Sequence, residues 1–154
     1  MQGLLLLNKP KGITSFSAVS SVRGKAHQKR IGHTGTLDPM AEGVLPILLG
    51  RATALSSLLL DGEKRYTAGI KLGIKTDTDD ITGQVIDTKP VNISHKDLLN
   101  ALNSFKGKQK QLPPMYSAIK KDGVRLYKLA REGKTVDIEK RDIEVFEINL
   151  CVKY

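Results

Sequence analysis

The sequence has very little cysteine and no long apolar stretch. Its 154 residues contain one cysteine, Cys151, so no internal disulfide can form, and we expect a reducing compartment. The longest apolar runs, such as Val44–Leu49, are far too short to span a bilayer. The leucine run near the start has no basic leader and ends at Asn8 and Lys9, which predicts a strand and not a signal peptide. These features predict a cytoplasmic protein that is not bound to a membrane.

The composition is that of a soluble globular protein with one ordinary core. Hydrophobic residues make up 40% of the chain, which also has 14 glycines and 6 prolines. No internal repeat or low-complexity segment divides it. One domain, and a monomer, is therefore the expectation.

Acidic residues are missing from the start of the chain. Lysine and arginine number 25 against 16 acids, a net charge of +9, and no acid precedes Asp38. Six cations in that stretch have nothing to neutralise them: Lys9, Lys11, Arg23, Lys25, Lys29 and Arg30. A second basic set contains only Asp122 as an opposing charge: Lys106, Lys108, Lys110, Lys120, Lys121, Arg125 and Lys128. Two such patches suit a phosphate backbone, although charge alone fits equally well a protein that is simply soluble and basic.

The segment Ile31–Leu49, which reads IGHTGTLDPMAEGVLPILL, holds the first carboxylate of the chain. Four turn-forming residues interrupt it: Gly32, Gly35, Pro39 and Gly43. We therefore expect no regular helix or strand before Val44, and we place Asp38 on a loop against a core strand. Pro39 restricts Asp38 to an extended or turn conformation, which fixes the direction of its carboxylate. Arg23, Lys25, Lys29 and Arg30 are expected beside this loop.

Hydrophobic spacing predicts an α/β (α+β) protein, with a mixed, largely antiparallel sheet flanked by helices. In the first half we expect a strand over Gln2–Asn8, a turn over Lys9–Gly12 and a second strand over Val44–Leu49. Between the turn and the second strand we expect a helix that is capped by Thr14 or Ser15, buries Phe16, Val19 and Val22, and ends at Gly24 or the basic run. A second helix is expected over Ala52–Leu60, packed by Leu55, Leu58 and Leu59.

The second half alternates strand and helix patterns. We expect a strand over Glu63–Gly73, a turn over Thr76–Gly83 and a strand over Gln84–Thr88. The Ser94–Asp97 capping box should open a helix that continues through Phe105, with His95 on the surface. After it we expect a basic linker over Lys106–Pro114, an extended segment over Met115–Ile119, a helix that buries Leu126, Leu129 and Ala130, and a long strand from Ile143. Asp77, Asp79 and Asp80 suggest a calcium loop, but the residues that follow are strand-like, so a solvated turn is favoured.

Five separated segments resemble motifs of the TruB-type family of tRNA pseudouridine synthases. The run Gly32–Pro39, followed by Gly43 and Leu45-Pro46, resembles the family's catalytic-aspartate motif. Lys64-Arg65-Tyr66 resembles its tyrosine motif. The other matching segments are Lys9–Gly12, Asp77–Asp79 and Leu112–Ala118, so the resemblance covers essentially the whole chain.

The resemblance implies the pseudouridine synthase fold and the isomerisation of uridine 55 in the T-loop of tRNA to pseudouridine, without cofactor or metal. It implies that Asp38 is the catalytic carboxylate, acting on a uridine that has left its stack. The tRNA T-arm would be the partner.

The resemblance also assigns substrate-binding roles, which we weigh against plainer alternatives. Tyr66 would stack on the target uracil, and the alternative is a core tyrosine at a strand edge. His33 would meet the T-loop where the uridine leaves its stack, and the alternative is a loop histidine bonded to the backbone. Lys9 is expected to be structural or close to a phosphate, and Arg23, Lys29 and Arg30 are candidate phosphate contacts.

One departure from the family pattern concerns the end of the chain. The family's catalytic domain continues through a Lys-Gly-Thr-Tyr-Ile-Arg-type segment, whose arginine pairs with the catalytic aspartate, and then into a small RNA-binding, PUA-like domain. We therefore expect residues 1–154 to be the N-terminal portion of the catalytic domain, C-terminally incomplete. This leaves two alternatives to an active enzyme: a catalytically incomplete fragment that binds tRNA, and a basic ribosome-associated structural protein for which Asp38 is dispensable.

Overall fold

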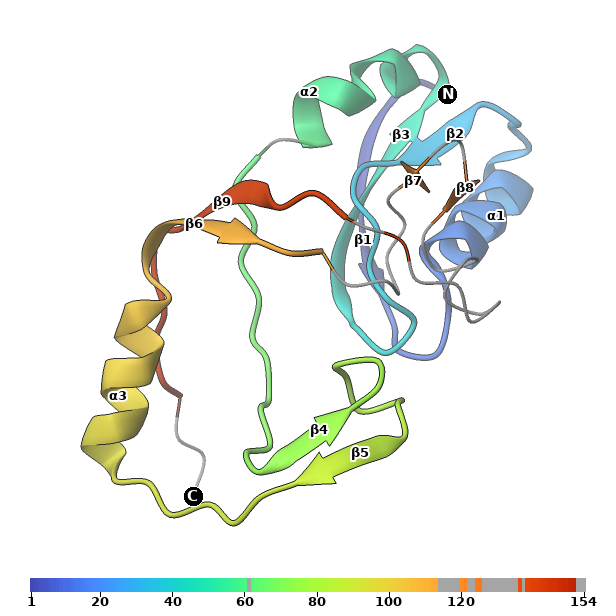
Figure 1. The fold of residues 1–154 in the computed structure, drawn as a ribbon. Helices are drawn as coiled ribbons and strands as arrows, with labels where there is room; N and C mark the ends of the chain where they lie inside the picture. Colours follow the sequence, from blue (N-terminus) through green and yellow to red (C-terminus); the bar gives the residue numbers. More distant parts are fainter. Residues whose placement is uncertain (61, 114–119, 122–123, 126–135, 137, 152–154) are drawn as a thin grey trace. The chain divides into compact units, whose positions relative to one another are not determined.

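The structure is a computed structural model in which the chain forms two compact units, Met1–Ala68 and Gly69–Tyr154 (Figure 1). It describes residues 1–60, 62–113, 120–121, 124–125, 136 and 138–151. The extended segment predicted over Met115–Ile119 and the helix predicted around Leu126, Leu129 and Ala130 lie outside the described residues. No helix among the residues described has the length and apolar character needed to cross a membrane.

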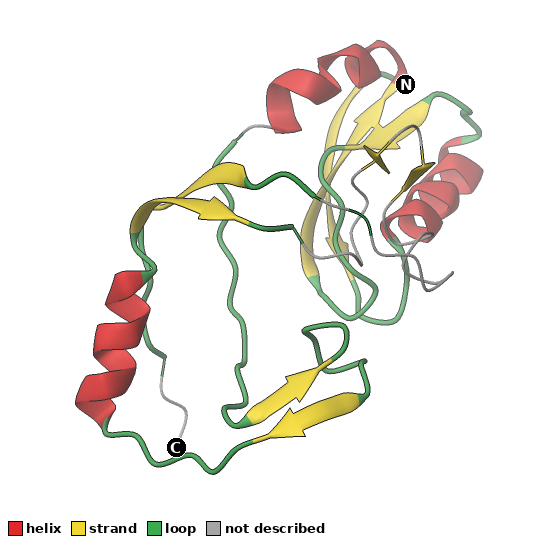
Figure 2. Cartoon of the chain, viewed as in Figure 1, coloured by secondary structure: helices red, strands yellow, loops and turns green. Residues whose placement is uncertain are grey.

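The first unit is a three-stranded antiparallel sheet with helices. Its elements are β1 (Gly3–Lys9), α1 (Ser15–Ala26), β2 (Ile31–His33), β3 (Gly43–Leu49), the 3-10 helix η1 (Gly50–Leu55) and α2 (Ser56–Leu60). The strand order is β1-β3-β2, so β3, the last of the three strands in the sequence, lies at the centre of the sheet. Figure 2 shows the strands in yellow and the helices in red. The register pairs Leu5 with Ile47 and Ile31 with Leu49.

One face of this sheet forms the core of the unit. Alternate residues of a strand point to the same face, so Leu45, Ile47 and Leu49 share one face. Ala18 and Val19 of α1 pack there, and Ile31 of β2 completes the cluster of buried side chains. On β1 and β3, Leu4, Leu6 and Val44 are instead 54%, 64% and 65% exposed.

Helix α1 begins where the sequence places its cap. The Thr14 side chain accepts a hydrogen bond from the Ser17 backbone N–H and so satisfies one free donor of the first turn. The helix continues past Gly24 and ends at His27, which adopts the left-handed conformation. Phe16, expected in the buried stripe, is 65% exposed, because the face that meets the sheet is centred on Ala18 and Val19.

Three further predictions for this unit are corrected. Residues Ile31–His33 do form a strand, β2, since they pair with β3 despite the glycines around them. The predicted helix over Ala52–Leu60 is a 3-10 helix followed by one short α-helix, and the three leucines expected to pack it are exposed: Leu55, Leu58 and Leu59. The strand predicted over Glu63–Gly73 is absent. That segment is irregular and exposed except for Gly73.

Among the described residues, the second unit consists of short antiparallel ladders and one helix. Its elements are β4 (Ile74–Thr76), β5 (Val85–Thr88), α3 (His95–Ser104), β6 (Gly107–Gln111), β7 (Lys120–Lys121), β8 (Val124–Arg125) and β9 (Arg141–Val145). The pairs are β4 with β5, β6 with β9, and β7 with β8. With the first unit, this gives the antiparallel strands with helices that the sequence predicts, although the described strands are divided among four sheets.

Local signals in this unit hold, and two longer-range predictions do not. The Ser94–Asp97 capping box opens α3, the β4–β5 hairpin forms, and His95 is exposed. The predicted linker Lys106–Pro114 instead contains β6, because its Lys and Gln residues pair with β9. The long strand predicted from Ile143 ends at Val145. In the 76–83 turn, the Asp80 carboxylate accepts hydrogen bonds from its own loop.

Candidate catalytic loop

Asp38 lies on the loop between β2 and β3 with its side chain exposed. The backbone turns immediately after it, where the Ala41 N–H donates to the Asp38 carbonyl at 3.0 Å. Among the described residues, no group donates a hydrogen bond to the Asp38 carboxylate or forms an ion pair with it. The first acid of the chain is thus available to a ligand that approaches the loop.

The backbone on both sides of Asp38 is fixed by the segment that leads into α1. Ser15 is 2% exposed; its hydroxyl donates to the Leu37 carbonyl and accepts from the Leu37 N–H, both at 3.0 Å. The Gly12 N–H donates to the Pro39 carbonyl at 2.8 Å. These bonds hold the residues immediately before and after Asp38, so its carboxylate stands on a loop attached to the rigid sheet and helix.

Lys9 supports the same region from inside. It is the last residue of β1, pairs with Gly43 at the start of β3, and is 0% exposed. Its ammonium donates to the carbonyls of Pro10 and Ile13, both at 2.9 Å. These bonds close the Lys9–Gly12 turn, from which Gly12 reaches the Asp38 loop. Of the two expectations for Lys9, this geometry supports the structural one.

His33 ends β2, five residues before Asp38, and pairs with Ile47. Its Nδ1 lies 2.5 Å from the Gly35 carbonyl. Because a carbonyl oxygen only accepts, Nδ1 carries the proton, which leaves the other ring nitrogen for a further partner. The half-buried imidazole is therefore bonded to the backbone and held at the entrance of the loop, so both interpretations of His33 remain compatible with its geometry.

Tyr66 is on an irregular segment and is 69% exposed. The alternative of a core tyrosine at a strand edge is therefore wrong. The ring is accessible for stacking, and its predicted contact with the target uracil stays a prediction.

The three arginine and lysine residues predicted to contact phosphate lie at the other end of the β2–β3 hairpin from Asp38. Lys29 and Arg30 directly precede β2, whereas the Asp38 loop follows it. The Arg23 Nη2 donates to the Ile31 carbonyl at 2.6 Å, and its Cζ lies 6.0 Å from the Phe16 ring centroid. The prediction that these side chains lie beside the Asp38 loop is corrected, because β2 separates them from it.

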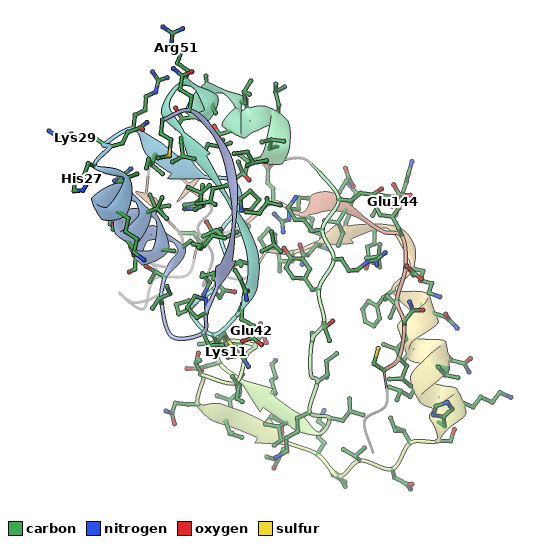
Figure 3. The ribbon with its side chains drawn as sticks, turned by 180° about the vertical axis from the view of Figure 1, so that it is seen from behind. Lys11, His27, Lys29, Glu42, Arg51 and Glu144 are labelled. Carbon is green, nitrogen blue, oxygen red and sulfur yellow. The ribbon has the colours of Figure 1, made fainter. Side chains whose placement is uncertain are left out.

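Two contributors to the site were not foreseen from the sequence. Ser15 was expected only as a helix cap, yet it is the main anchor of the loop. Arg51, an exposed cation at the start of η1, is brought by β3 to the end of the hairpin where Lys29 lies (Figure 3). Neither is signalled locally in the sequence, because Ser15 bonds to a residue 22 positions away and the place of Arg51 depends on the pairing of β2 with β3.

Within the part of the chain that the structure describes, no three histidine, cysteine, aspartate or glutamate residues gather closely enough to hold a metal ion. Lys11 and Glu42, at the Asp38 end of the sheet, approach each other to 3.9 Å and are 68% and 64% exposed (Figure 3). Such an exposed pair contributes little to stability.

The fold and this loop define a mixed α/β protein that presents the exposed Asp38 carboxylate on an anchored loop, at the opposite end of the sheet from Lys29, Arg30 and Arg51. Residues 23–153 match the family model described as "TruB family pseudouridylate synthase (N terminal domain)". The chain therefore belongs to the TruB family of pseudouridylate synthases, through its N-terminal domain.

The relatives agree with this assignment. The chain is 47% identical over 150 residues to the "tRNA pseudouridine synthase B" of Clostridium kluyveri, covering 97% of this chain and 52% of that protein. It is 49% identical over 155 residues to the protein of the same name from Bacillus subtilis, covering 99% and 50%. Thus the chain spans about half the length of the curated relatives it matches. Among solved structures it resembles a chain of "a Cbf5-Nop10-Gar1 Complex", with a TM-score of 0.53 and 25% identity over 77% of this chain and 31% of that chain.

Proposed function

We propose that this chain forms the catalytic-aspartate half of an enzyme that isomerises uridine 55 in the T-loop of tRNA to pseudouridine, with Asp38 as the catalytic group. The observation that carries the proposal is the Asp38 loop itself. Its backbone is anchored through Ser15 and Gly12, while its carboxylate is exposed and unpaired among the described residues. An anchored, accessible carboxylate is what the chemistry requires.

The reaction needs no co-reactant. The bond from C1′ to N1 of the uridine breaks, the captive uracil turns over, C1′ joins C5, C5 loses its proton and N1 gains one. A carboxylate serves this sequence by adding to the base or the sugar, or by taking a sugar proton. Asp38 would supply that group, and no oxidant, reductant or metal enters the balance.

His33 and Tyr66 would hold the displaced base. A base inside a folded loop has to be extruded before it can react, which costs a few kcal/mol. The flat imidazole of His33, fixed by its bond to the Gly35 carbonyl, would stabilise the gap that the base leaves. Tyr66, 69% exposed, would stack on the uracil and keep it from escaping after the C1′–N1 bond is cut.

The test is nucleoside analysis of a T-arm RNA hairpin after incubation with the chain. We expect pseudouridine at position 55 with the unchanged chain and none with Asp38→Asn, which keeps the shape of the side chain and removes its charge. A matched control, Asp87→Asn in β5, alters an exposed aspartate of the second unit and should leave the yield unchanged. Equal yields from the unchanged chain and Asp38→Asn would contradict the proposed role.

A second function, a tRNA-binding fragment that does not turn over, is favoured by one observation: the chain spans about half of its relatives. This alternative predicts salt-dependent binding of the hairpin, with no pseudouridine from either protein. Binding measured on the same samples separates the two functions.

A further inference from the structure

Four exposed basic residues gather where β2 begins and β3 ends. We call this set the basic cluster: His27, Lys29, Arg30 and Arg51. Figure 3 shows the labelled members, His27, Lys29 and Arg51, at the end of the first unit that lies opposite Lys11 and Glu42. Because Glu42 belongs to the loop that carries Asp38, the basic cluster and the catalytic carboxylate lie at opposite ends of the same sheet.

Hydrogen bonds fix the backbone beneath the basic cluster. The Gly50 N–H donates to the Arg30 carbonyl at 2.8 Å, and the Thr53 hydroxyl donates to the Gly50 carbonyl at 2.9 Å. The Arg30 Nε in turn donates to the Thr53 hydroxyl at 3.0 Å. The two chain segments are therefore joined, one carrying Lys29 and Arg30 and the other Arg51.

Gly50 makes this junction close. Its φ is +62°, and a Cβ placed there would lie 2.8 Å from the Met1 carbonyl and 3.2 Å from the Gln28 side-chain nitrogen. Only glycine allows both the left-handed backbone and this approach. The positions from which the cations extend are thus preorganised, although the side chains remain exposed.

Nothing in the described structure neutralises the basic cluster. The sequence has no acid before Asp38. Lysines that do approach a carboxylate among the described residues lie elsewhere in the chain: Lys11, Lys89 and Lys110. For Arg30, only Nε is bonded among the described residues, so both terminal nitrogens are left for a ligand with two acceptor oxygens, as a phosphate has.

The length of β3 sets the distance between the basic cluster and Asp38. The strand has seven residues, Gly43–Leu49, with the Asp38 loop at one end and Arg51 just beyond the other. At about 3.3 Å per residue these span roughly 20 Å. A ligand that contacts both ends has to be at least that long, which excludes a single nucleotide.

We propose that the basic cluster binds the phosphate backbone of an RNA helix at a point roughly 20 Å from the nucleotide presented to Asp38. This inference rests on the proposed function for the identity of the RNA, and it adds that the chain contacts the stem of that RNA as well as its loop. Loop recognition at Asp38 and backbone recognition at the basic cluster would then be separable contributions to affinity.

The experiment compares two RNA hairpins with the same T-loop, one with a stem longer than about 20 Å and one with only its closing base pairs. Binding is measured by fluorescence anisotropy over a range of salt concentrations, using the unchanged chain, Lys29→Gln/Arg51→Gln, and the charge-matched control Lys71→Gln/Lys75→Gln, whose lysines are exposed in the second unit. All substituted residues are exposed, so folding should be retained, and circular dichroism checks this.

For the long hairpin, we expect Lys29→Gln/Arg51→Gln to weaken binding roughly twenty-fivefold at about 0.15 M salt, about fivefold for each phosphate that is no longer bound. The slope of log affinity against log salt should fall by about two. The short hairpin should bind the variant and the unchanged chain within about twofold, since it cannot reach the basic cluster.

An equal weakening on both hairpins, a weakening no greater than that of the control, or no binding of either RNA by the unchanged chain would overturn the inference. The variant could bind the long hairpin more weakly than the unchanged chain does, and the short hairpin equally well, while the unchanged chain forms no pseudouridine. That result would count against the proposed function alone, because binding does not depend on chemistry at Asp38.

Discussion

Asp38 and Asp80 both lie in loops, but their carboxylates differ in hydrogen bonding. The Asp80 carboxylate accepts from the hydroxyls of Thr78 and Thr82 and from the Thr82 N–H, and these bonds hold its pKa below the ordinary value. The Asp80 carboxylate therefore stabilises its own turn. The Asp38 loop is shaped by other residues, Ser15 and Gly12, so its carboxylate is left for a ligand.

Lys9 supports that loop indirectly, through the turn from which Gly12 bonds to Pro39. Replacing it with methionine keeps the buried volume but removes the two bonds to the carbonyls of Pro10 and Ile13. We expect Lys9→Met to lower the free energy of unfolding by about 2–3 kcal/mol, because two part-buried hydrogen bonds from a charged donor to backbone carbonyls are lost. Urea unfolding measures this change.

Lys11→Met is the matched control for that measurement. Lys11 is two residues away and exposed, and its ion pair among the described residues is a long one, 3.9 Å to Glu42. Its substitution should change the unfolding free energy by less than about 0.5 kcal/mol. Equal effects of the two substitutions would show that the Lys9 bonds do not support the turn.

At the scale of elements, the sequence predicts well the features that depend on neighbouring residues, such as the starts of helices. The Thr14 cap and the Ser94–Asp97 capping box satisfy backbone donors within three residues, so the starts of α1 and α3 follow from the sequence. Strand β6, rich in Lys and Gln, has no apolar pattern and exists because β9, some 30 residues later, pairs with it. The alternation around Tyr66 has no such partner among the described residues and forms no strand.

The same distinction applies to the site. Asp38, His33 and the turn-rich loop between β2 and β3 can be found from sequence, because the motif is contiguous. The anchoring role of Ser15 cannot, since its bond to Leu37 joins residues 22 positions apart. Nor can the placement of Lys29 and Arg51 at the same end of the hairpin, which depends on the register of β2 against β3.

Helix α3 provides a pH-dependent prediction. Hydrogen bonds from the Ser94 hydroxyl and backbone N–H hold the pKa of Asp97 below its ordinary value. A lowered folded-state pKa means that the capping box stabilises the helix above the ordinary pKa of aspartate, and that this contribution is lost as the pH falls through the lowered value. Ser94→Ala should raise the pKa of Asp97 toward the ordinary value.

Carboxyl-carbon NMR titration measures that change. Ser104→Ala is the control, because the Ser104 hydroxyl donates to the Ala101 carbonyl at the far end of α3, away from Asp97. An Asp97 titration that is the same in Ser94→Ala and in the unchanged chain would contradict the role of the capping box.

At the scale of the whole chain, the two units differ in how much apolar surface they bury. Every buried alanine, valine, isoleucine and leucine among the described residues belongs to Met1–Ala68: Ala18, Val19, Ile31, Leu45, Ile47, Leu48 and Leu49. In the second unit, β5 is exposed along its whole length. Packing, not hydrogen bonding alone, supplies most resistance to opening, so the units should differ in local stability.

Amide hydrogen exchange tests this difference. We expect the slowest exchange in β3, at Leu45 and Ile47, and exchange at least about tenfold faster in β5 and α3. The comparison is internal, because both sets of amides are read in one sample. Uniform protection over the two units would contradict the account and would show that the second unit has a stable core of its own.

The central claim is that Asp38 acts on a uridine that has left its RNA stack. The most direct measurement is single-turnover release of tritium from C5 of uridine 55 in a T-arm hairpin, with protein in excess over RNA. We predict release by the unchanged chain and a decrease of at least about a thousandfold in Asp38→Asn, with hairpin affinity changed less than about threefold. Release by Asp38→Asn at the rate of the unchanged chain would contradict the claim.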